Sequence, residues 1–487
     1  MELDWLLAPP VPEAMPRQRV LYHRLRDAIL AGRLAPGTPL PASRSLAASL
    51  KIARNTVLFA YEQLVAEGCL LADRQGTRVA PLPERPVAPF GGVAPIEPLQ
   101  LSARAAAALQ PEPWRDAAAL PFAPGTPDYG AFPFRSWRAC LERAWRDAGW
   151  RQLGYAAHGG DPALREAIAG HLTTVRGLAV DAAQIVITSG TQAALDLCAR
   201  LLADHGDTVW AENPGYLAAR VAFSLAGLRV HDVMVDSEGM APNADDWSRH
   251  PPRLIMITPS HQYPTGRVMS LPRRLALIEQ ARRSGAWIIE DDYDSEFRRA
   301  GPAPPALFGL QAEVPVVYVG TFSKTLYPGL RLGYLVLPQA IATDFARATS
   351  QATRAGQGIE QRTLADFIQR GYYTTHLRRM RARYAARQAA LRSALREAFG
   401  PSLELSGGEA GLHLVLWLPD SIRDTDVVKR AAALGLGVRA LGSYARAPLT
   451  CNGLVLGYGN LEEGMLAEAV RRLVAAVQTA GSQRRED

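Results

Sequence analysis

The first eighty residues carry apolar and polar positions with the periods of short helices and strands. Apolar side chains recur every three or four positions over residues 20–32, a helical spacing that ends at Gly32. Ser43 is placed to cap a short second helix, and a third helix begins at Arg54. Residues 69–80 contain two β-rich runs around a glycine. The pattern predicts a helix, a tight helix-turn-helix and a two-stranded wing.

The pattern changes at a segment rich in proline and glycine, residues 81–98. Such a segment can neither continue a helix nor form a central strand, so we expect a linker. Beyond it, β-rich runs alternate with helical stretches such as residues 271–284, which predicts an α/β domain with a mainly parallel sheet. From about residue 383, a long helix leads into a smaller α+β unit that ends in a helix over residues 462–479. The β-rich runs are residues 184–189, 253–259, 286–291 and 315–321.

Length and composition are those of a globular chain with several domains. A chain of 487 residues is too long for a peptide hormone or a disulfide miniprotein and fits about two to four folding units. Hydrophobic residues make up 48% and charged residues 21%, as in ordered proteins. We find neither an apolar stretch long enough to span a membrane nor a secretion signal at the N-terminus. We therefore expect a cytoplasmic protein without a membrane partner.

The charge of the chain and its rarer residue types limit the kinds of binding site that we expect. The net charge is +7, and residues 17–80 hold ten lysines and arginines against four aspartates and glutamates. Such an excess favours binding to a polyanion, and a compositional bias of an arginine-rich chain is the alternative interpretation. The four cysteines form no CxxC pair and the nine histidines no HExxH motif, so we expect neither a disulfide framework nor a metal. Only Lys51, Lys324 and Lys429 are lysines.

The third predicted helix carries polar side chains where a recognition helix presents them to DNA. Arg54, Asn55 and Thr56 occupy its first turn, from which side chains can reach base edges and phosphates. A small helical bundle with surface arginines is the alternative interpretation.

The motifs of this region closely resemble the winged-helix DNA-binding domain of the GntR family. They are residues 21–25 (LYHRL), 32–47 (GRLAPGTPLPASRSLA) and 54–68 (RNTVLFAYEQLVAEG). The resemblance implies contacts with double-stranded operator DNA from the wing, including Arg78, and from the two helices. The helix residues implied are Ser43, Arg44, Arg54, Asn55 and Thr56. The wing departs from the family pattern, with Cys69 in place of an aromatic residue and a tip that reads DRQG over residues 73–76.

Two motifs of the second domain place polar groups directly after predicted strands. Ser189, Gly190 and Thr191 join a strand to a helix, whose free N–H groups and dipole favour a phosphate. Asp291 and Tyr293 follow a buried strand, at the edge where open α/β sheets bind ligands. An acidic strand end alone also fits a metal site or a helix cap.

A third motif carries a reactive amine. Lys324 directly follows a β-rich run, Thr321 and Ser323 supply neighbouring hydroxyls, and Arg331 comes seven residues later. A lysine in a desolvated pocket can have a lowered pKa and form a Schiff base, and an arginine can hold a phosphate. A surface lysine is the alternative interpretation.

In this order, the three motifs resemble the fold-type I pyridoxal 5′-phosphate (PLP) enzymes of the aspartate aminotransferase class, over about residues 120–480. The resemblance implies that Lys324 forms the internal aldimine, Asp291 pairs with the pyridinium nitrogen and Tyr293 faces the 3′-oxygen. Tyr155 resembles the tyrosine that reaches the phosphate of the neighbouring subunit, which implies a homodimer. Further implied cofactor contacts are phosphate binding by Ser189, Gly190, Thr191, Thr321 and Arg331, a place beside the lysine for Ser323, and ring stacking by Tyr216.

Two departures from the aminotransferase pattern concern transamination. Residues 259–266 read PSHQYPTG, so tyrosine stands where those enzymes have asparagine directly before Pro-Thr-Gly. Residues 452–459 (NGLVLGYG) lack the arginine that usually clamps an amino-acid carboxylate. Arg439 and Arg220 are the candidates for that role.

A winged helix, a linker and an aminotransferase-like domain in one chain resemble the MocR subfamily of GntR transcription regulators. We expect the DNA-binding domain over residues 14–80, the linker over 81–118 and the PLP-binding domain over 119–482. The resemblance implies a sequence-specific regulator that senses PLP, or an amine or amino-acid effector, through an aldimine at Lys324. The alternative is an aminotransferase that carries a DNA-binding appendage.

Overall fold

The computed structural model describes residues 6, 15–74, 76–81, 100–109, 119–155, 157–299, 301, 304–353, 356–447, 449 and 452–483. The chain divides into two units, Met1–Leu99 and Gln100–Asp487. Much of the predicted linker, residues 82–99 and 110–118, lies outside the described residues. Between these two stretches, α4 (Ala103–Ala108) contacts α9 (Leu217–Ala226) of the second unit.

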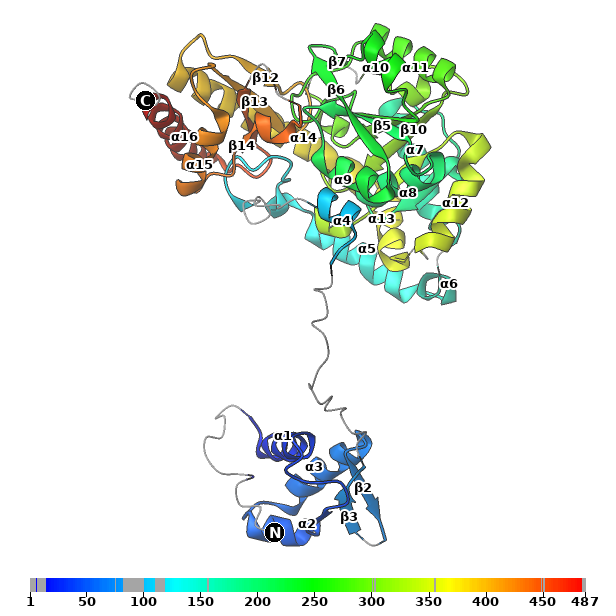
Figure 1. The fold of residues 1–487 in the computed structure, drawn as a ribbon, viewed down its shortest axis with the longest axis vertical. Helices are drawn as coiled ribbons and strands as arrows, with labels where there is room; N and C mark the ends of the chain where they lie inside the picture. Colours follow the sequence, from blue (N-terminus) through cyan, green and yellow to red (C-terminus); the bar gives the residue numbers. More distant parts are fainter. Residues whose placement is uncertain are drawn as a thin grey trace, which may run out of the picture. The chain divides into compact units, whose positions relative to one another are not determined.

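A winged helix-turn-helix forms the N-terminal unit (Figure 1). Apolar side chains of all three helices and of the wing share one core, and Leu21, Leu25, Val57 and Leu64 are fully buried in it. Gly32 follows the first helix with a φ of +74°, the left-handed conformation expected of a helix-ending glycine. The elements are α1 (Arg17–Leu30), β1 (Pro39–Leu40), α2 (Ser43–Ser49), α3 (Arg54–Ala66), β2 (Leu70–Asp73) and β3 (Gly76–Val79), with sheet order β1-β3-β2.

The predicted capping role of Ser43 is wrong. Helix α2 begins at Ser43 itself, Ala42 occupies the cap position, and no side chain caps the helix. The Ser43 hydroxyl instead accepts a hydrogen bond from Arg54 Nε at 3.3 Å. Ser43 therefore links the first turn of α2 to the first turn of α3.

Among the described residues, eight strands form the large sheet of the second unit, in the order β4-β11-β10-β9-β8-β5-β6-β7. Strands β10, β9, β8, β5 and β6 are parallel, in agreement with the mainly parallel sheet predicted, although β5 and β6 had not been predicted as strands from the sequence. Strand β11 is antiparallel to both its neighbours, because the segment after β10 is too short for the crossover that a parallel strand needs. The strands are β4 (Ile185–Thr188), β5 (Thr208–Asn213), β6 (Arg229–Asp236), β7 (Gly239–Met240), β8 (Leu254–Ile257), β9 (Trp287–Asp292), β10 (Val316–Thr321) and β11 (Gly333–Val336).

Helices cover both faces of this sheet. Successive strand residues alternate between the faces, so that Ile288 packs under α11 while Ile289 packs under α8 and α9. One face carries α8 (Thr191–Leu202), α9 and α12 (Gln339–Thr353). The other carries α5 (Phe134–Arg146), α7 (Pro162–Arg176), α10 (Ala244–Arg249), α11 (Leu271–Ser284) and α13 (Gly358–Gln369). The buried strands explain the continuous apolar runs in the sequence.

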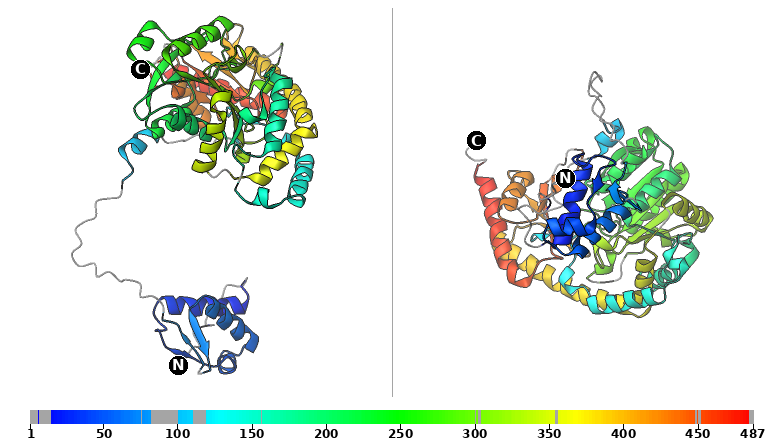
Figure 2. Two further views of the ribbon diagram at one scale, coloured as in Figure 1. Left: turned by 90° about the vertical axis from the view of Figure 1, so that its right-hand side faces the viewer. Right: turned by 90° about the horizontal axis from the view of Figure 1, so that it is seen from below.

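A smaller antiparallel sheet, in the order β12-β13-β15-β14, packs with three helices at the C-terminal end (Figure 2). The first of these helices begins earlier than predicted, at Tyr372 instead of about residue 383, because Tyr373, Leu377 and Met380 extend its buried stripe. The elements are α14 (Tyr372–Phe399), β12 (Leu405–Gly407), β13 (His413–Leu418), α15 (Asp424–Ala433), β14 (Arg439–Ala440), β15 (Asn452–Gly457) and α16 (Glu463–Gln483). In the described part of the chain, no helix is both long and apolar enough to cross a membrane.

Candidate functional site

A cavity of about 420 Å³ opens at the carboxyl ends of the central strands. It brings together side chains that are far apart in the sequence, because parallel strands end at the same edge of a sheet. Of the predicted cofactor residues, Thr191, Tyr216, Asp291, Tyr293, Thr321, Ser323, Lys324 and Arg331 line it.

The amine of Lys324 lies inside this cavity. Lys324 Nζ donates a hydrogen bond to the backbone oxygen of Gly125 at 2.9 Å. Desolvation lowers the pKa of Lys324, and the carboxyl groups of Asp294 and Asp291 oppose this shift. Gly125 has a φ of +73°, and a Cβ added there would stand 2.9 Å from Lys324 Nζ. The glycine therefore leaves the room in which the amine lies.

Asp291 presents an unsatisfied acceptor at the end of β9. Its side chain is buried, and its Oδ1 makes no hydrogen bond with any described residue. Burial raises the pKa of Asp291 to about 8, and nearby carboxyl groups add to the shift. A buried acceptor without a donor is costly unless a bound molecule supplies one. A protonated ring nitrogen would do so.

An anion cradle lies where β4 meets α8 and faces Arg331. Gly190 precedes the helix with a φ of +85°, and the first turn of α8 leaves backbone N–H groups without helical partners. A Cβ added at Gly190 would approach the Arg331 guanidinium to 3.3 Å. Arg331 Nη2 donates to the backbone oxygen of Ser189 at 3.0 Å, and Thr321 Oγ1 lies 3.1 Å from Ser323 Oγ. These groups could hold a phosphate.

Tyr216 forms an aromatic wall of the cavity. Gln192 Nε2 donates to its hydroxyl at 3.1 Å. Its ring stands edge-on to Tyr263, with 6.1 Å between the ring centroids. The unpartnered Asp291, the amine, the cradle and an aromatic ring together fit a phosphorylated pyridine aldehyde.

Several residues that line the cavity had not been predicted. Gly125, His413 and Asp294 belong to this group. Gly125 and His413 lie in no motif that indicates a site, whereas Asp294 directly follows Tyr293 in the stretch EDDYDSE over residues 290–296. Tyr263, which replaces the expected asparagine, directs its hydroxyl to Tyr444 Oη at 2.9 Å. His261, one of the nine histidines without ligand spacing, lies with Asp294 and His413 in a buried cluster with one possible ligand atom from each within 4.8 Å.

Only one of the two arginines predicted as candidates for binding an effector carboxylate lines the cavity. Arg439 lines the cavity from β14, and its Nη1 donates to Tyr444 Oη at 3.4 Å. Arg220 pairs with Asp232, with an Nη2–Oδ2 distance of 3.2 Å, and does not line the cavity.

Tyr155 does not line the cavity, and it belongs to a stretch with exposed apolar side chains at Trp145, Trp150, Leu153 and Tyr155, called here the apolar surface. Trp150 is 78% exposed and Tyr155 76% exposed. Trp145 and Leu153 are exposed as well. Several large exposed apolar groups within one short stretch are typical of a protein interface.

The predicted DNA-binding residues gather at the start of α2 and α3. Arg44, Arg54 and Asn55 are exposed, and Ser43 and Thr56 are half-buried. Arg78 on β3 forms an ion pair with Asp73, with an Nη2–Oδ2 distance of 2.7 Å. Of the predicted DNA-binding residues, the exposed basic groups Arg44 and Arg54 lie on the helix-turn-helix, whereas Arg78 is paired with Asp73 within the wing.

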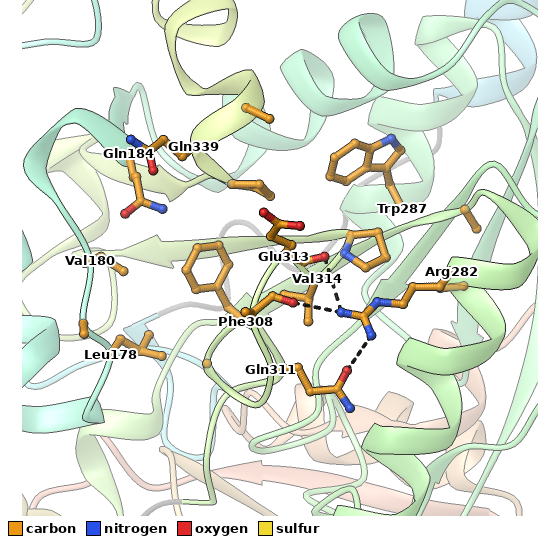
Figure 3. A pocket seen from close by; sticks show the side chains of 18 of the residues that line it. Leu178, Val180, Gln184, Arg282, Trp287, Phe308, Gln311, Glu313, Val314 and Gln339 are labelled. Carbon is orange, nitrogen blue, oxygen red and sulfur yellow. Dashed lines mark hydrogen bonds between the residues drawn. The ribbon is translucent and has the colours of Figure 1, made fainter.

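A second cavity, of about 900 Å³, lies at the opposite ends of the strands (Figure 3). Trp287 and Phe308 line it, and Arg282 is held there by Gln311 Oε1 at 2.8 Å and by the backbone oxygen of Ala312 at 2.9 Å. It contains none of the predicted site residues.

Comparison with known proteins gives the family of each unit. Residues 17–79 match the bacterial regulatory proteins of the gntR family, and residues 120–436 match the aminotransferase class I and II family. The chain is 38% identical to the probable rhizopine catabolism regulatory protein MocR of Rhizobium meliloti, over 95% of this chain and 94% of that protein. It is 33% identical to the pyridoxine biosynthesis transcriptional regulator PdxR of Corynebacterium glutamicum, over 98% and 99% of the two chains.

The second unit also matches a solved enzyme structure. That structure is LysN, an α-aminoadipate aminotransferase from Thermus thermophilus, in complex with N-(5′-phosphopyridoxyl)-L-leucine. The TM-score is 0.70 at 28% identity, over 78% of this chain and 98% of LysN. With a gntR-family domain, an aminotransferase-type domain and full-length similarity to regulators that combine them, the chain belongs to the MocR group of GntR transcription regulators.

Proposed function

We propose that this protein is a sequence-specific, DNA-binding transcription regulator that uses PLP as its sensor. The observation that carries the proposal is the cavity in which the Lys324 amine, the unpartnered Asp291 Oδ1 and the cradle beside Arg331 face one space. When bound, PLP supplies an aldehyde that reacts with amines and a ring that withdraws electrons. The effector is PLP itself, or an amine or amino acid that competes with Lys324 for the aldehyde.

Each group in the cavity has one task in this proposal. Lys324 binds the aldehyde covalently, because its lowered pKa favours the neutral, nucleophilic amine. Asp291 accepts the ring N–H, and Tyr216 covers the ring. Ser189, Gly190, Thr191, Thr321, Ser323 and Arg331 hold the phosphate.

Visible absorption spectra test the cofactor site directly. We expect the wild type to gain an absorption band with PLP that resists dialysis and that the Lys324→Ala variant lacks. Lys429→Ala is the matched control, because Lys429 lies exposed on α15. A band that persists in Lys324→Ala, or that is equally lost in Lys429→Ala, would refute the role of Lys324.

Operator binding tests the regulator function. The exposed side chains of Arg44, Arg54 and Asn55 are proposed to contact the DNA together with Ser43, Thr56 and Arg78. We expect Arg54→Ala to lower operator affinity by about 1 to 3 kcal/mol and Arg249→Ala, which removes an exposed arginine of the second unit, to leave it unchanged. Unchanged affinity in Arg54→Ala would contradict the placement of the recognition helix.

A homodimer completes the proposal. The apolar surface of Trp145, Trp150, Leu153 and Tyr155 is exposed in the single chain, and the proposed role of Tyr155 is to reach the phosphate of the neighbouring subunit. A dimer would also place two winged helices on the two halves of one operator. Analytical ultracentrifugation of the full chain tests this state.

An effector carboxylate is assigned to Arg439. This arginine lines the cavity beside Tyr444, whereas Arg220 is occupied by Asp232. We expect Arg439→Gln to weaken the spectral response to an amino acid more than the response to the amine that lacks its carboxylate. Arg220→Gln is the control, and equal losses for both ligands would refute the assignment.

Amino-acid transamination is the second candidate function, since the cavity holds the lysine, aspartate and arginine of an aminotransferase-type site. Tyr263 in place of asparagine and the absence of an arginine from residues 452–459 argue against efficient turnover. Multiple turnovers of an amino acid with a keto acid would support an enzyme with a DNA-binding appendage. Conversion of the bound cofactor once, without turnover, would support the regulator.

A further inference from the structure

Buried polar side chains form a hydrogen-bonded group with the hydroxyl of Tyr293. Tyr293 Oη lies 3.0 Å from His261 Nδ1 and donates to the backbone oxygen of His261 at 2.9 Å. The same Nδ1 lies 3.1 and 3.2 Å from the two carboxylate oxygens of Asp294. His261 and Asp294 are 1% and 2% exposed. Two atoms of His261 therefore hold one hydroxyl group, and Asp294 holds His261.

The hydrogens of this group have defined directions. A carboxylate beside Nδ1 fixes the imidazole with its hydrogen on that nitrogen, where Tyr293 Oη also lies. Burial and the carboxyl group of Asp294 raise the pKa of Tyr293 well above its usual value, so the phenol keeps its hydrogen. In this structure the hydrogen is donated to the His261 carbonyl. His261 Nδ1 fixes the position of the Tyr293 oxygen, and rotation of the O–H bond from that carbonyl toward the cavity makes the hydroxyl a donor to a bound molecule.

Tyr263 does not share this task. Its hydroxyl is hydrogen-bonded to Tyr444 of the small subdomain, which is the smaller sheet β12-β13-β15-β14 with the helices packed on it. The Tyr263 ring meets that of Tyr293 edge-on, with 5.8 Å between the ring centroids. Other ionisable groups around Tyr293 and Lys324 come from several elements that border the cavity. They include Glu212 at the end of β5, Asp291 on β9, His413 on β13 and Arg439 on β14, and the side chains of Tyr129, Tyr216 and Arg331 also line the cavity.

We propose that His261 and Asp294 are positioning residues that hold the Tyr293 hydroxyl as the donor to the ring oxygen of PLP. This inference rests on the proposed function, because it requires PLP in the cavity. The pair thereby sets the pH at which the cofactor bound at Lys324 changes its absorption. The Tyr293 hydroxyl stabilises the negative charge of the ring oxygen by donating a hydrogen bond to it. Without that donor the charged form is less stable, so the bound cofactor keeps its proton to a higher pH and the pH midpoint of the absorption band rises.

A pH titration of the visible band tests this proposal in the full-length, PLP-loaded protein. We expect Tyr293→Phe to raise the midpoint by about one pH unit. His261→Ala and Asp294→Asn shift it in the same direction. The double variant Tyr293→Phe with His261→Ala is expected to match Tyr293→Phe alone, because both changes remove the same hydrogen bond. His261→Asn, whose amide can replace Nδ1, is expected to restore part of the wild-type midpoint.

Asp246→Asn is the matched control, since Asp246 Oδ1 pairs with His231 Nε2 at 2.8 Å and does not line the cavity. Its midpoint should equal that of the wild type. Near-ultraviolet circular dichroism of each variant tests whether its tertiary structure is retained. A wild-type midpoint in His261→Ala beside a raised midpoint in Tyr293→Phe would overturn the proposal, as would additive shifts in the double variant.

Failure of the positioning role can be distinguished from failure of the cofactor site. If the wild type shows no Lys324-dependent band, the proposed cofactor site fails, whereas a normal band with an unchanged His261→Ala midpoint overturns the positioning role alone. The cluster of His261, Asp294 and His413 also requires a metal test. A midpoint that EDTA shifts and zinc restores would assign the cluster to a metal and overturn the proposal.

Discussion

The buried carboxyl group of Asp291 is expected to make the PLP-free protein less stable as the pH rises. In the unfolded chain this carboxyl group loses its proton near pH 4, whereas burial raises the pKa of Asp291 in the folded state to about 8. Between these values the folded state holds a proton that the unfolded state has released, so stability falls with increasing pH. A pH of 7 lies about three pH units above the pKa of this carboxyl group in the unfolded chain. The folded protein is therefore less stable at pH 7 than at about pH 4 by at most about 4 kcal/mol.

Asp291→Asn removes this titration and keeps the shape of the side chain. The amide also changes the free energy of unfolding, by an amount that does not depend on pH. We therefore expect the stability of the variant relative to the wild type to increase by up to about 1.4 kcal/mol per pH unit between pH 5 and 8. The same substitution should weaken PLP binding, because the amide cannot neutralise a protonated ring nitrogen.

Urea unfolding of the PLP-free proteins at pH 5, 6, 7 and 8, followed by tryptophan fluorescence, measures this difference. Asp344→Asn is the control, since that side chain is 76% exposed. A difference between Asp291→Asn and the wild type that stays constant across the pH series would refute the reasoning. Addition of PLP should stabilise the wild type at pH 8 and have much less effect on Asp291→Asn.

Three further predictions concern single groups of the site and its surroundings. Gly125→Ala should lower PLP saturation in absorption spectra and cost about 1 kcal/mol in urea unfolding, because its φ of +73° disfavours a side chain and the new Cβ meets the Lys324 amine. Arg331→Gln should weaken PLP binding by about tenfold or more while leaving pyridoxal binding unchanged, because it removes a charge-assisted phosphate contact; equal losses in a fluorescence titration would contradict this. Trp150→Glu should shift the chain toward monomer in ultracentrifugation, because it places a charge in the exposed apolar surface.

The elements with strong local signals were predictable from the sequence. The predicted helix over residues 271–284 matches α11, because Ser270 caps its start and Gly285 ends it in a left-handed conformation with a φ of +71°. The start of α14 was predicted too late, because its first turns have no N-terminal capping side chain. The antiparallel β11 was not predicted, because apolar content alone does not give strand direction.

The site was predictable where its residues follow strands directly. Asp291, Thr321 and Lys324 come together because β9 and β10 are parallel neighbours that end at the same edge. Gly125 and His413 reach the cavity through the tertiary fold, from segments whose local sequence has no chemical motif. The grouping of His261 with Asp294 depends on contacts across 33 positions of the chain, which spacing rules for helices and strands do not detect.

The hydrogen bond between Lys324 and Gly125 connects the cavity amine to residues 119–125, the described segment that precedes α5. This segment is also anchored to the small subdomain, since Gly437 and Gly457 donate backbone hydrogen bonds to Pro121 and Phe122 at 2.8 and 2.9 Å. A lysine nitrogen bonded to a cofactor carbon has fewer hydrogens to donate than a free ammonium group. If Lys324 binds PLP covalently as proposed, the Gly125 carbonyl loses this donor. The hold on residues 119–125, which follow the predicted linker of residues 81–118, would then depend more on the backbone hydrogen bonds from Gly437 and Gly457.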